Sequence, residues 1–234
     1  MKVIFRAIGP SLRVNGQPVE GRLKDPVLEL YNRNGVLLAT NDNWKDDPQA
    51  GEVEQSNLAP RNERESALAR TLTPGVYTAI IRGKDNTSGI GLVEAYDRGH
   101  PPRVEAEMAN ISTRGFVDTG DNAMIGGFIT GGRPGATRIV VRGLGPSLTN
   151  KGVPDALQDP VIQLINANGS VIRSNDNWRE APNRDDIAAR GLAPKNDRES
   201  ALLQTVQPGD YTVILRGKPN APAGNGLVEI YNVD

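Results

Sequence analysis

Short apolar runs separated by turn residues follow one another along the chain, with the two-residue period of β-strands. Apolar and polar positions alternate from Tyr77 to Arg82 and from Tyr211 to Arg216, each after a Pro-Gly turn. Side chains of a strand point alternately to its two faces, so this period predicts strands with one buried face. Asn34-Gly35 and Asn168-Gly169 lie between apolar runs and predict type I′ hairpin turns, which need positive φ at both central residues. One short helix is predicted around residues 184–190.

The strand and turn motifs occur twice, in the same order. The matching pairs are IFRAIGPSL at 4–12 with VVRGLGPSL at 140–148, KDPVLELYNRNGVLLATNDNW at 24–44 with QDPVIQLINANGSVIRSNDNW at 158–178, LAPRNERESAL at 58–68 with LAPKNDRESAL at 192–202, and GIGLVEAYD at 89–97 with GNGLVEIYN at 224–232. Such ordered self-similarity indicates a duplicated unit of roughly one hundred residues. We therefore predict a first module at 1–98, a connector at 99–103 and a second module at 104–234.

The two copies are unequal, because the second has an additional segment before its GPSL motif. That segment, Val104 to Arg138, contains two further predicted strands at 105–114 and 123–130. We predict an all-β fold of two tandem β-sandwich (jelly-roll-like) modules, the first lacking two leading strands. A sheet with an open edge exposes unpaired backbone groups. We expect a preceding repeat, the chain's own 104–138 segment or a neighbouring chain to complete the first module.

Composition narrows the possible classes of protein. The 234 residues include 26 Gly and 17 Pro, which suits many tight turns, and aromatic residues make up only 4%, so the core must be aliphatic. The net charge is −1 and the charges are evenly spread, which argues against a nucleic-acid partner. The absence of cysteine excludes disulfides. No apolar run is long enough to span a bilayer, and Met1-Lys2 leads directly into a strand rather than a signal segment.

The sequence shows no catalytic constellation. The single histidine, His100, lies in the predicted connector, so no histidine recurs beside Ser11 and Ser147 to activate their hydroxyls. Neither serine lies in a nucleophile elbow, and Gly126-Gly127 lacks the strand–loop–helix setting of a phosphate site. We therefore expect a protein that is not an enzyme and has no cofactor, with calcium as the one candidate ion.

The repeated NDNW motif is the best candidate binding site. Asp and Asn oxygens are ligands that calcium prefers. The candidate ligands are Asp25, Asn41, Asp42 and Asn43 in the first module and Asp159, Asn175, Asp176 and Asn177 in the second, with Asp46 and Asp47 near the first set. The spacing differs from an EF-hand and the motif ends in Trp rather than Glu. The alternative, which we favour, is that these side chains cap their own turn.

Aromatic and charged residues recur at matching places in the two copies. Trp44 and Trp178 either cover an edge of the core or stack on the pyranose face of a glycan. Arg6 and Arg142 interrupt apolar strands, so each needs a carboxylate partner unless it captures a ligand. Arg64-Glu65 and Arg198-Glu199 are predicted to form similar structural pairs.

The strand motifs resemble those of a known family. The run DPVLELYNRNGVLLATNDNW, followed by TPGVYTAIIRG and GLVEAY, resembles the bacterial pre-peptidase C-terminal domain and related repeats of large secreted and surface-attached bacterial proteins. ANISTRGF…GDNAMIGGF…IVVRGLGPSL resembles the front half of those repeats, so the resemblance covers nearly the whole chain. It implies an extracellular β-sandwich accessory module linked to adhesion, substrate attachment and assembly.

Two functions from different classes follow. The first is an extracellular or cell-surface structural repeat of a fibre, stalk or surface assembly, held by strand addition or self-association between modules. The second is a ligand-binding accessory module that recognises a glycan or a matrix protein, with or without calcium. An aromatic groove would favour the second function, and an open sheet edge the first.

Overall fold

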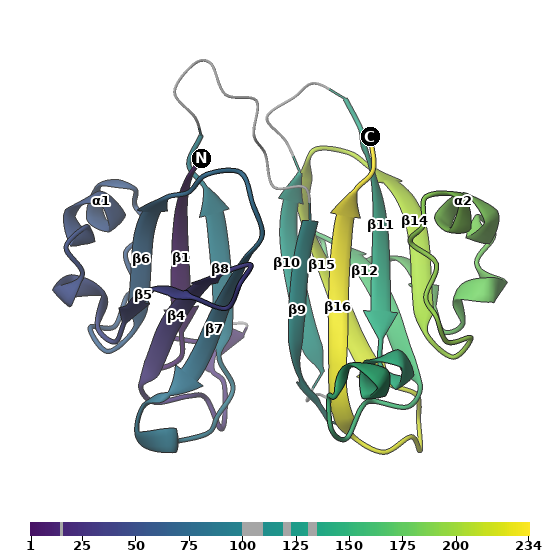
Figure 1. The fold of residues 1–234 in the computed structure, drawn as a ribbon, viewed down its shortest axis with the longest axis horizontal. Coiled ribbons are helices and arrows are strands. Elements are labelled where there is room, and N and C mark those ends of the chain that lie inside the picture. The colour runs from purple at the N-terminus through teal and green to yellow at the C-terminus, as the bar shows by residue number, and fades with distance from the viewer. Residues whose placement is uncertain (15, 100–109, 119–122, 131–134) are drawn as a thin grey trace. The chain divides into compact units, whose positions relative to one another are not determined.

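The computed structural model describes residues 1–14, 16–99, 110–118, 123–130 and 135–234. The chain divides into two compact units, Met1–Met108 and Ala109–Asp234, shown in Figure 1 and described separately below. The all-β prediction is confirmed, because four main antiparallel sheets form two sandwiches, one in each unit. The connector predicted at 99–103 lies, apart from Gly99, outside the described residues.

The second unit is a sandwich of two four-stranded sheets, ordered β14-β11-β16-β9 and β10-β15-β12-β13. The strands are β9 (Asn110–Val117), β10 (Met124–Thr130), β11 (Thr137–Leu144), β12 (Pro160–Asn166), β13 (Val171–Asn175), β14 (Ser200–Val206), β15 (Gly209–Gly217) and β16 (Gly224–Asn232). Alternate side chains such as Val141, Ile162 and Leu215 point between the sheets and form one aliphatic core.

The first unit has the same arrangement with three strands in each sheet, ordered β6-β1-β8 and β5-β4-β7. The strands are β1 (Lys2–Ile8), β4 (Pro26–Asn32), β5 (Leu37–Asn41), β6 (Ser66–Thr71), β7 (Tyr77–Gly83) and β8 (Leu92–Asp97), and β2 (Arg13–Val14) and β3 (Gln17–Pro18) form a small separate hairpin. Val3, Phe5, Leu28, Leu30 and Leu68 occupy the space between the sheets.

A short helical layer covers the outer face of one sheet in each unit. The helix predicted around 184–190 is α2 (Arg184–Ala189), and α1 (Ala50–Gln55) is its counterpart. Val53 of α1 packs on Ile4, which lies on the opposite face of β1 from Val3 and Phe5. The described residues also form the 3₁₀ turns η1 (Trp44–Asp46), η2 (Lys84–Asn86), η3 (Pro146–Lys151) and η4 (Trp178–Glu180).

The predicted hairpins form, but the type I′ turns are wrong. Only Gly35 has positive φ, at 74°, whereas Asn34 does not. The reason is Asn32, whose Oδ1 accepts hydrogen bonds from the backbone N–H groups of Asn34 (2.9 Å) and Val36 (3.0 Å). This side chain holds a three-residue loop that ends in glycine, and the strand register shifts beside it. The second unit repeats the arrangement with Asn166, Asn168, Gly169 and Ser170.

The two units differ by one strand in each sheet. In the second unit β9 pairs with β16 and β10 pairs with β15, so the two leading strands each add to one edge of the sandwich. Their bounds differ by a few residues from the predicted 105–114 and 123–130, and residues 105–109 lie outside the described part. In the first unit, among the described residues, β8 pairs only with β1 and β7 only with β4.

Candidate functional site

The asparagines of the NDNW motif hold the turn that follows β5 and β13. Asn41 Oδ1 accepts a hydrogen bond from the Ala67 backbone N–H (3.0 Å), and its Nδ2 donates to the Asn43 carbonyl (2.8 Å). Asn43 Nδ2 donates to Asp46 (3.0 Å). Asn175 and Asn177 make the equivalent contacts with Ala201, the Asn177 carbonyl and Glu180. The amides are thus engaged in local structure, as the turn-capping hypothesis expects.

In each unit the aspartate of the motif faces a lysine, which comes from the loop after β7 in the first unit and from the loop after β15 in the second. Lys84 Nζ lies 2.5 Å from Asp42 Oδ2, and Lys218 Nζ lies 2.5 Å from Asp176 Oδ2. The Lys218 backbone N–H also donates to the Asp159 carbonyl (2.8 Å). Burial, with the neighbouring Asp176 charge, raises the pKa of Asp159. The lysine ammonium therefore lies beside these carboxylates and supplies the positive charge that a calcium ion would otherwise provide.

The arrangement of the carboxylates bears on the calcium hypothesis. Asp25, Asp42, Asp159 and Asp176 each have one buried carboxylate oxygen without a hydrogen-bond partner. Within the described ranges, no three Asp, Glu, His or Cys side chains are grouped so that they could hold a metal ion. Asp46 accepts from Asn43, and the buried Asp47 pairs with Arg70 at 2.8 Å. Calcium binding stays a prediction that needs a direct test.

Replacing Asp159 with asparagine is expected to raise the melting temperature of the second unit at neutral pH. A carboxyl whose pKa is raised by folding is penalised when it ionises in the native state. That penalty is absent below the unfolded-state pKa of about 4 and grows as pH rises towards the folded-state pKa. The gain in Asp159→Asn should therefore shrink to nothing in acid. Thermal melts of both chains between pH 3 and 7 measure it.

A calcium site would give a different result for the Asp159→Asn variant. A ligand that binds only the folded chain must raise its stability. If millimolar calcium raised the melting temperature of the unaltered chain, and Asp159→Asn abolished that rise, the lysine-neutralised arrangement would be wrong and the Asp159–Asp176 pair would be a calcium site.

The two tryptophans are buried against the helical layer. Trp44 is 8% exposed and packs with Val53, and Trp178 is 6% exposed and packs with Ile187. Lys45 and Arg179 lie over their rings, with the cations 5.6 and 4.5 Å from the ring centroids. Stacking on a sugar needs an open ring face, which side chains buried to this degree do not offer.

A fully buried glutamate fastens the GPSL loop to the sheet in each unit. Glu65 is 0% exposed and accepts hydrogen bonds from the backbone N–H groups of Gly9 (3.1 Å) and Ser11 (2.8 Å) and from the Ser11 hydroxyl. Glu199 does the same for Gly145 (3.0 Å) and Ser147 (2.9 Å). The predicted pairing of Glu65 with Arg64 and of Glu199 with Arg198 is therefore wrong: the neighbour along the chain is not the partner.

The arginines in the apolar strands have the carboxylate partners that their burial requires. Arg6 Nε donates to Glu94 Oε2 (2.8 Å), and its Nη1 donates to the Leu58 carbonyl (2.8 Å). Tyr96 completes the group, since its hydroxyl accepts from Arg6 and donates to Glu94. Arg142, Glu229, Leu192 and Tyr231 form the same network. These arginines are engaged within their own units.

The β7–β8 edge of the first unit is less buried than its counterpart. On β7 and β8 the side chains that face the core are half-buried, whereas the aligned side chains of β15 and β16 are buried. The half-buried set is Ala79, Ile81, Val93 and Ala95, and the aligned set is Val213 and Leu215 (both 0% exposed), Val228 (2%) and Ile230 (6%). The additional strands of the second unit account for this difference, because they cover the same edge there.

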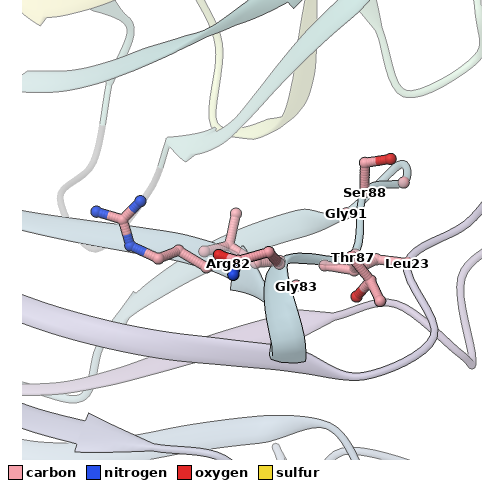
Figure 2. Close-up of a pocket in the computed structure, with 9 residues that line it drawn as sticks. Leu23, Arg82, Gly83, Thr87, Ser88 and Gly91 are labelled. Atoms are coloured by element: carbon pink, nitrogen blue, oxygen red, sulfur yellow. The ribbon is translucent and has the colours of Figure 1, made fainter.

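A pocket of about 390 Å³ opens at the end of this edge, lined by the end of β7, by the loop that joins β7 to β8 and by Leu23 (Figure 2). Leu23 and Ile81 form its apolar wall, and Gly89 and Gly91 also line it. Asn86, Thr87 and Ser88 give it a polar rim. The sequence did not predict a binding site at this edge. The available signal was the absence, ahead of the first copy, of the two strands that precede the second copy's GPSL motif.

Comparisons with known proteins give little beyond the fold. No family model and no curated protein matches the chain. Among solved structures, "Crystal Structure of the STIV MCP" matches with a TM-score of 0.32 and 10% identity over 99% of this chain and 86% of that one. The infectious bursal disease virus VP2 subviral particle matches with a TM-score of 0.20 and 11% identity over 99% and 56%. The pre-peptidase C-terminal resemblance stays a prediction. No helix in the described part of the chain is long and apolar enough to cross a membrane.

Proposed function

We propose that this chain is an extracellular structural repeat protein, part of a fibre, stalk or surface assembly built through β-sheet contacts between modules. The observation that carries the proposal is the open β7–β8 edge, at which both sheets of the first unit stop one strand short of the second unit's sheets. Natural sheets protect or pair their edges, because unpaired N–H and C=O groups recruit other strands. An edge with half-buried core side chains therefore favours a partner.

The surroundings of the edge support an assembly role more than catalysis. Repeated ionisable groups outside the edge are engaged in structural contacts: Glu65 with the GPSL loop, Arg6 with Glu94, and Lys84 with Asp42. Strand addition uses main-chain hydrogen bonds for affinity and alternate side-chain pockets for specificity. The first unit offers both. The strand and turn motifs that resemble surface-attached bacterial repeats favour an extracellular or cell-surface setting and a link to adhesion.

A second candidate function is a ligand-binding accessory module for a glycan or a matrix protein. The pocket beside β7 favours it, since its volume is in the range of small-molecule sites and Thr87 and Ser88 offer hydroxyl groups. This function predicts saturable binding of a free ligand by a monomeric chain, and the assembly function predicts concentration-dependent self-association.

Replacing Ala95 with lysine is expected to weaken self-association at least about tenfold, because the inward-facing ammonium would lose its water on strand addition. Light scattering across a concentration series measures the association, and negative-stain imaging shows whether the assemblies are linear. Leu38→Lys is the matched control, since Leu38 lies on β5, the opposite edge of the same unit, and is already 47% exposed.

Circular dichroism of both variants establishes that each retains its fold. A chain that stays monomeric at every concentration would contradict self-assembly. A loss of association in Leu38→Lys but not in Ala95→Lys would move the contact to the other edge.

A further inference from the structure

The pocket beside β7 has a filled counterpart in the second unit. There Val117, at the end of β9, is 0% exposed and shares a core cluster with Met124, Leu157 and Leu215. A Cβ on Gly226 would lie 3.2 Å from Val117 Cγ2. The residues aligned with Leu157, Leu215 and Gly226 are Leu23, Ile81 and Gly91, and all three line the pocket of the first unit. The pocket thus lies where β9 and β10 place Val117 and Met124.

We propose that the β7–β8 edge of the first unit is an acceptor site for two linked strands of the β9–β10 type, one for each sheet, supplied by a neighbouring module. This inference rests on the proposed assembly function and gives that contact a partner and a register. The chain's own pair is engaged in the second unit, with β9 on β16 and β10 on β15. The acceptor site therefore needs a second pair of the same type.

The second unit fixes the register of the donor strands. Val117 lies opposite Gly224, which aligns with Gly89, so the donor strand beside β8 places a branched aliphatic residue opposite Gly89 and into the pocket. Met124 lies opposite Leu215, the counterpart of Ile81, so the strand beside β7 begins with a long apolar residue.

An aromatic contact defines the far end of the donor strand beside β7. Phe128 stacks on Tyr211 with ring centroids 5.4 Å apart and an interplanar angle of 19°. Tyr77 is the aligned residue of the first unit and, like Tyr211, is half-buried. The donor therefore carries an aromatic residue four positions after the apolar residue that faces Ile81.

The donor differs from β10 itself in one respect. β10 has Gly126 opposite Val213, where a Cβ would lie 3.4 Å from Val228 Cγ1 and 3.9 Å from Ile230 Cδ1. The first unit keeps valine at the position of Val228, as Val93, but has Ala79 and Ala95 in place of Val213 and Ile230, which leaves more room on the side of those two residues. A larger aliphatic side chain therefore fits the acceptor more easily at the position where the second unit has glycine. A donor with this larger side chain would fill the space beside Ala79 and Ala95, so the edge would bind it in preference to the chain's own strands.

The test adds the missing pair covalently to the full chain. A second copy of residues 110–136 is placed directly ahead of Met1, since Met1 aligns with Thr137, so the loop keeps its length. We expect the graft to raise the melting temperature of the first unit by on the order of 10 °C, because it buries apolar side chains along both edge strands, and to remove the association that this edge mediates. Calorimetry and light scattering measure the two effects.

Two variants of the grafted copy test the register. Val117→Asp in that copy would put a carboxylate into the pocket and should remove the gain in melting temperature. Gly126→Val in that copy should raise the temperature further, whereas the same change in the native β10 should lower that of the second unit. The acceptor site is wrong if the graft leaves the melting temperature of the first unit unchanged, or if the graft with Val117→Asp raises it by the same amount.

The same set of chains separates this inference from the proposed function. If the unaltered chain never associates but the graft still stabilises its first unit, self-assembly fails and the acceptor site stands. If the unaltered chain associates and the stabilised graft associates equally, the assembly uses another surface and the acceptor is not its contact.

Discussion

Replacing Glu199 with alanine is expected to destabilise the second unit by about 3–4 kcal/mol. The carboxylate is fully buried and accepts from the backbone N–H groups of Gly145, Ser147 and Asn196. Its removal leaves several N–H groups buried without an acceptor, and each such group costs about 1–3 kcal/mol where water cannot reach it. Urea unfolding followed by circular dichroism measures the loss.

The control for Glu199 lies two residues away in the same loop. Asp197 pairs with Arg179 at the surface, where its side chain is 67% exposed. Asp197→Ala should leave the unfolding midpoint almost unchanged, because exposed ion pairs contribute little. Glu199→Gln, which keeps one carbonyl oxygen, should fall between the two. A Glu199→Ala chain as stable as the Asp197→Ala chain would contradict the fastening role of the glutamate.

The second large effect is expected at the Arg142–Glu229 pair. Their side chains are only 15% and 12% exposed, so Glu229→Leu leaves a guanidinium in the sheet with little water around it. We expect a loss on the order of 3 kcal/mol from this single change. The double variant, Arg142→Met with Glu229→Leu, removes both charges and should recover most of the loss. The double-mutant cycle measures the coupling free energy directly.

The same cycle on an exposed pair is the control. Arg179 and Asp197 are 61% and 67% exposed, so their coupling should be small. Equal coupling in the two cycles would mean that burial does not set the strength of the Arg142–Glu229 pair. Additive single losses in Arg142→Met and Glu229→Leu would mean that the two side chains act independently, against the hydrogen bonds between them.

The order of motifs allowed the duplication, the all-β class and the two additional strands to be predicted, because each depends on local periodicity and on self-similarity. The partners of Glu65 and Glu199 could not be predicted in this way. Glu65 contacts Gly9 and Ser11, 56 and 54 residues earlier in the chain. A carboxylate's neighbours along the chain say nothing of backbone groups that the fold brings to it.

The type I′ prediction failed for a different reason. The prediction uses the Asn-Gly pair alone, but Asn32, two residues before Asn34, sets the geometry of the turn through its own side chain. The sequence predicts a carboxylate partner for Arg6, because an arginine in an apolar strand needs one, but it does not identify Glu94 as that partner. The pocket could not be predicted because its lining residues come from separate parts of the chain, near Leu23 and from Ile81 to Gly91, which only the fold brings together.

Each unit contains one tryptophan, at an equivalent place beneath the helical layer. Both indoles are buried, so each will fluoresce at shorter wavelength while its unit is folded and shift to the red when that unit opens. The duplication has thus left the chain with one intrinsic optical reporter for the sandwich of three-stranded sheets and one for the sandwich of four-stranded sheets. Unequal stability of the two halves will appear as two separate steps in the emission, and Trp44→Phe will silence the first.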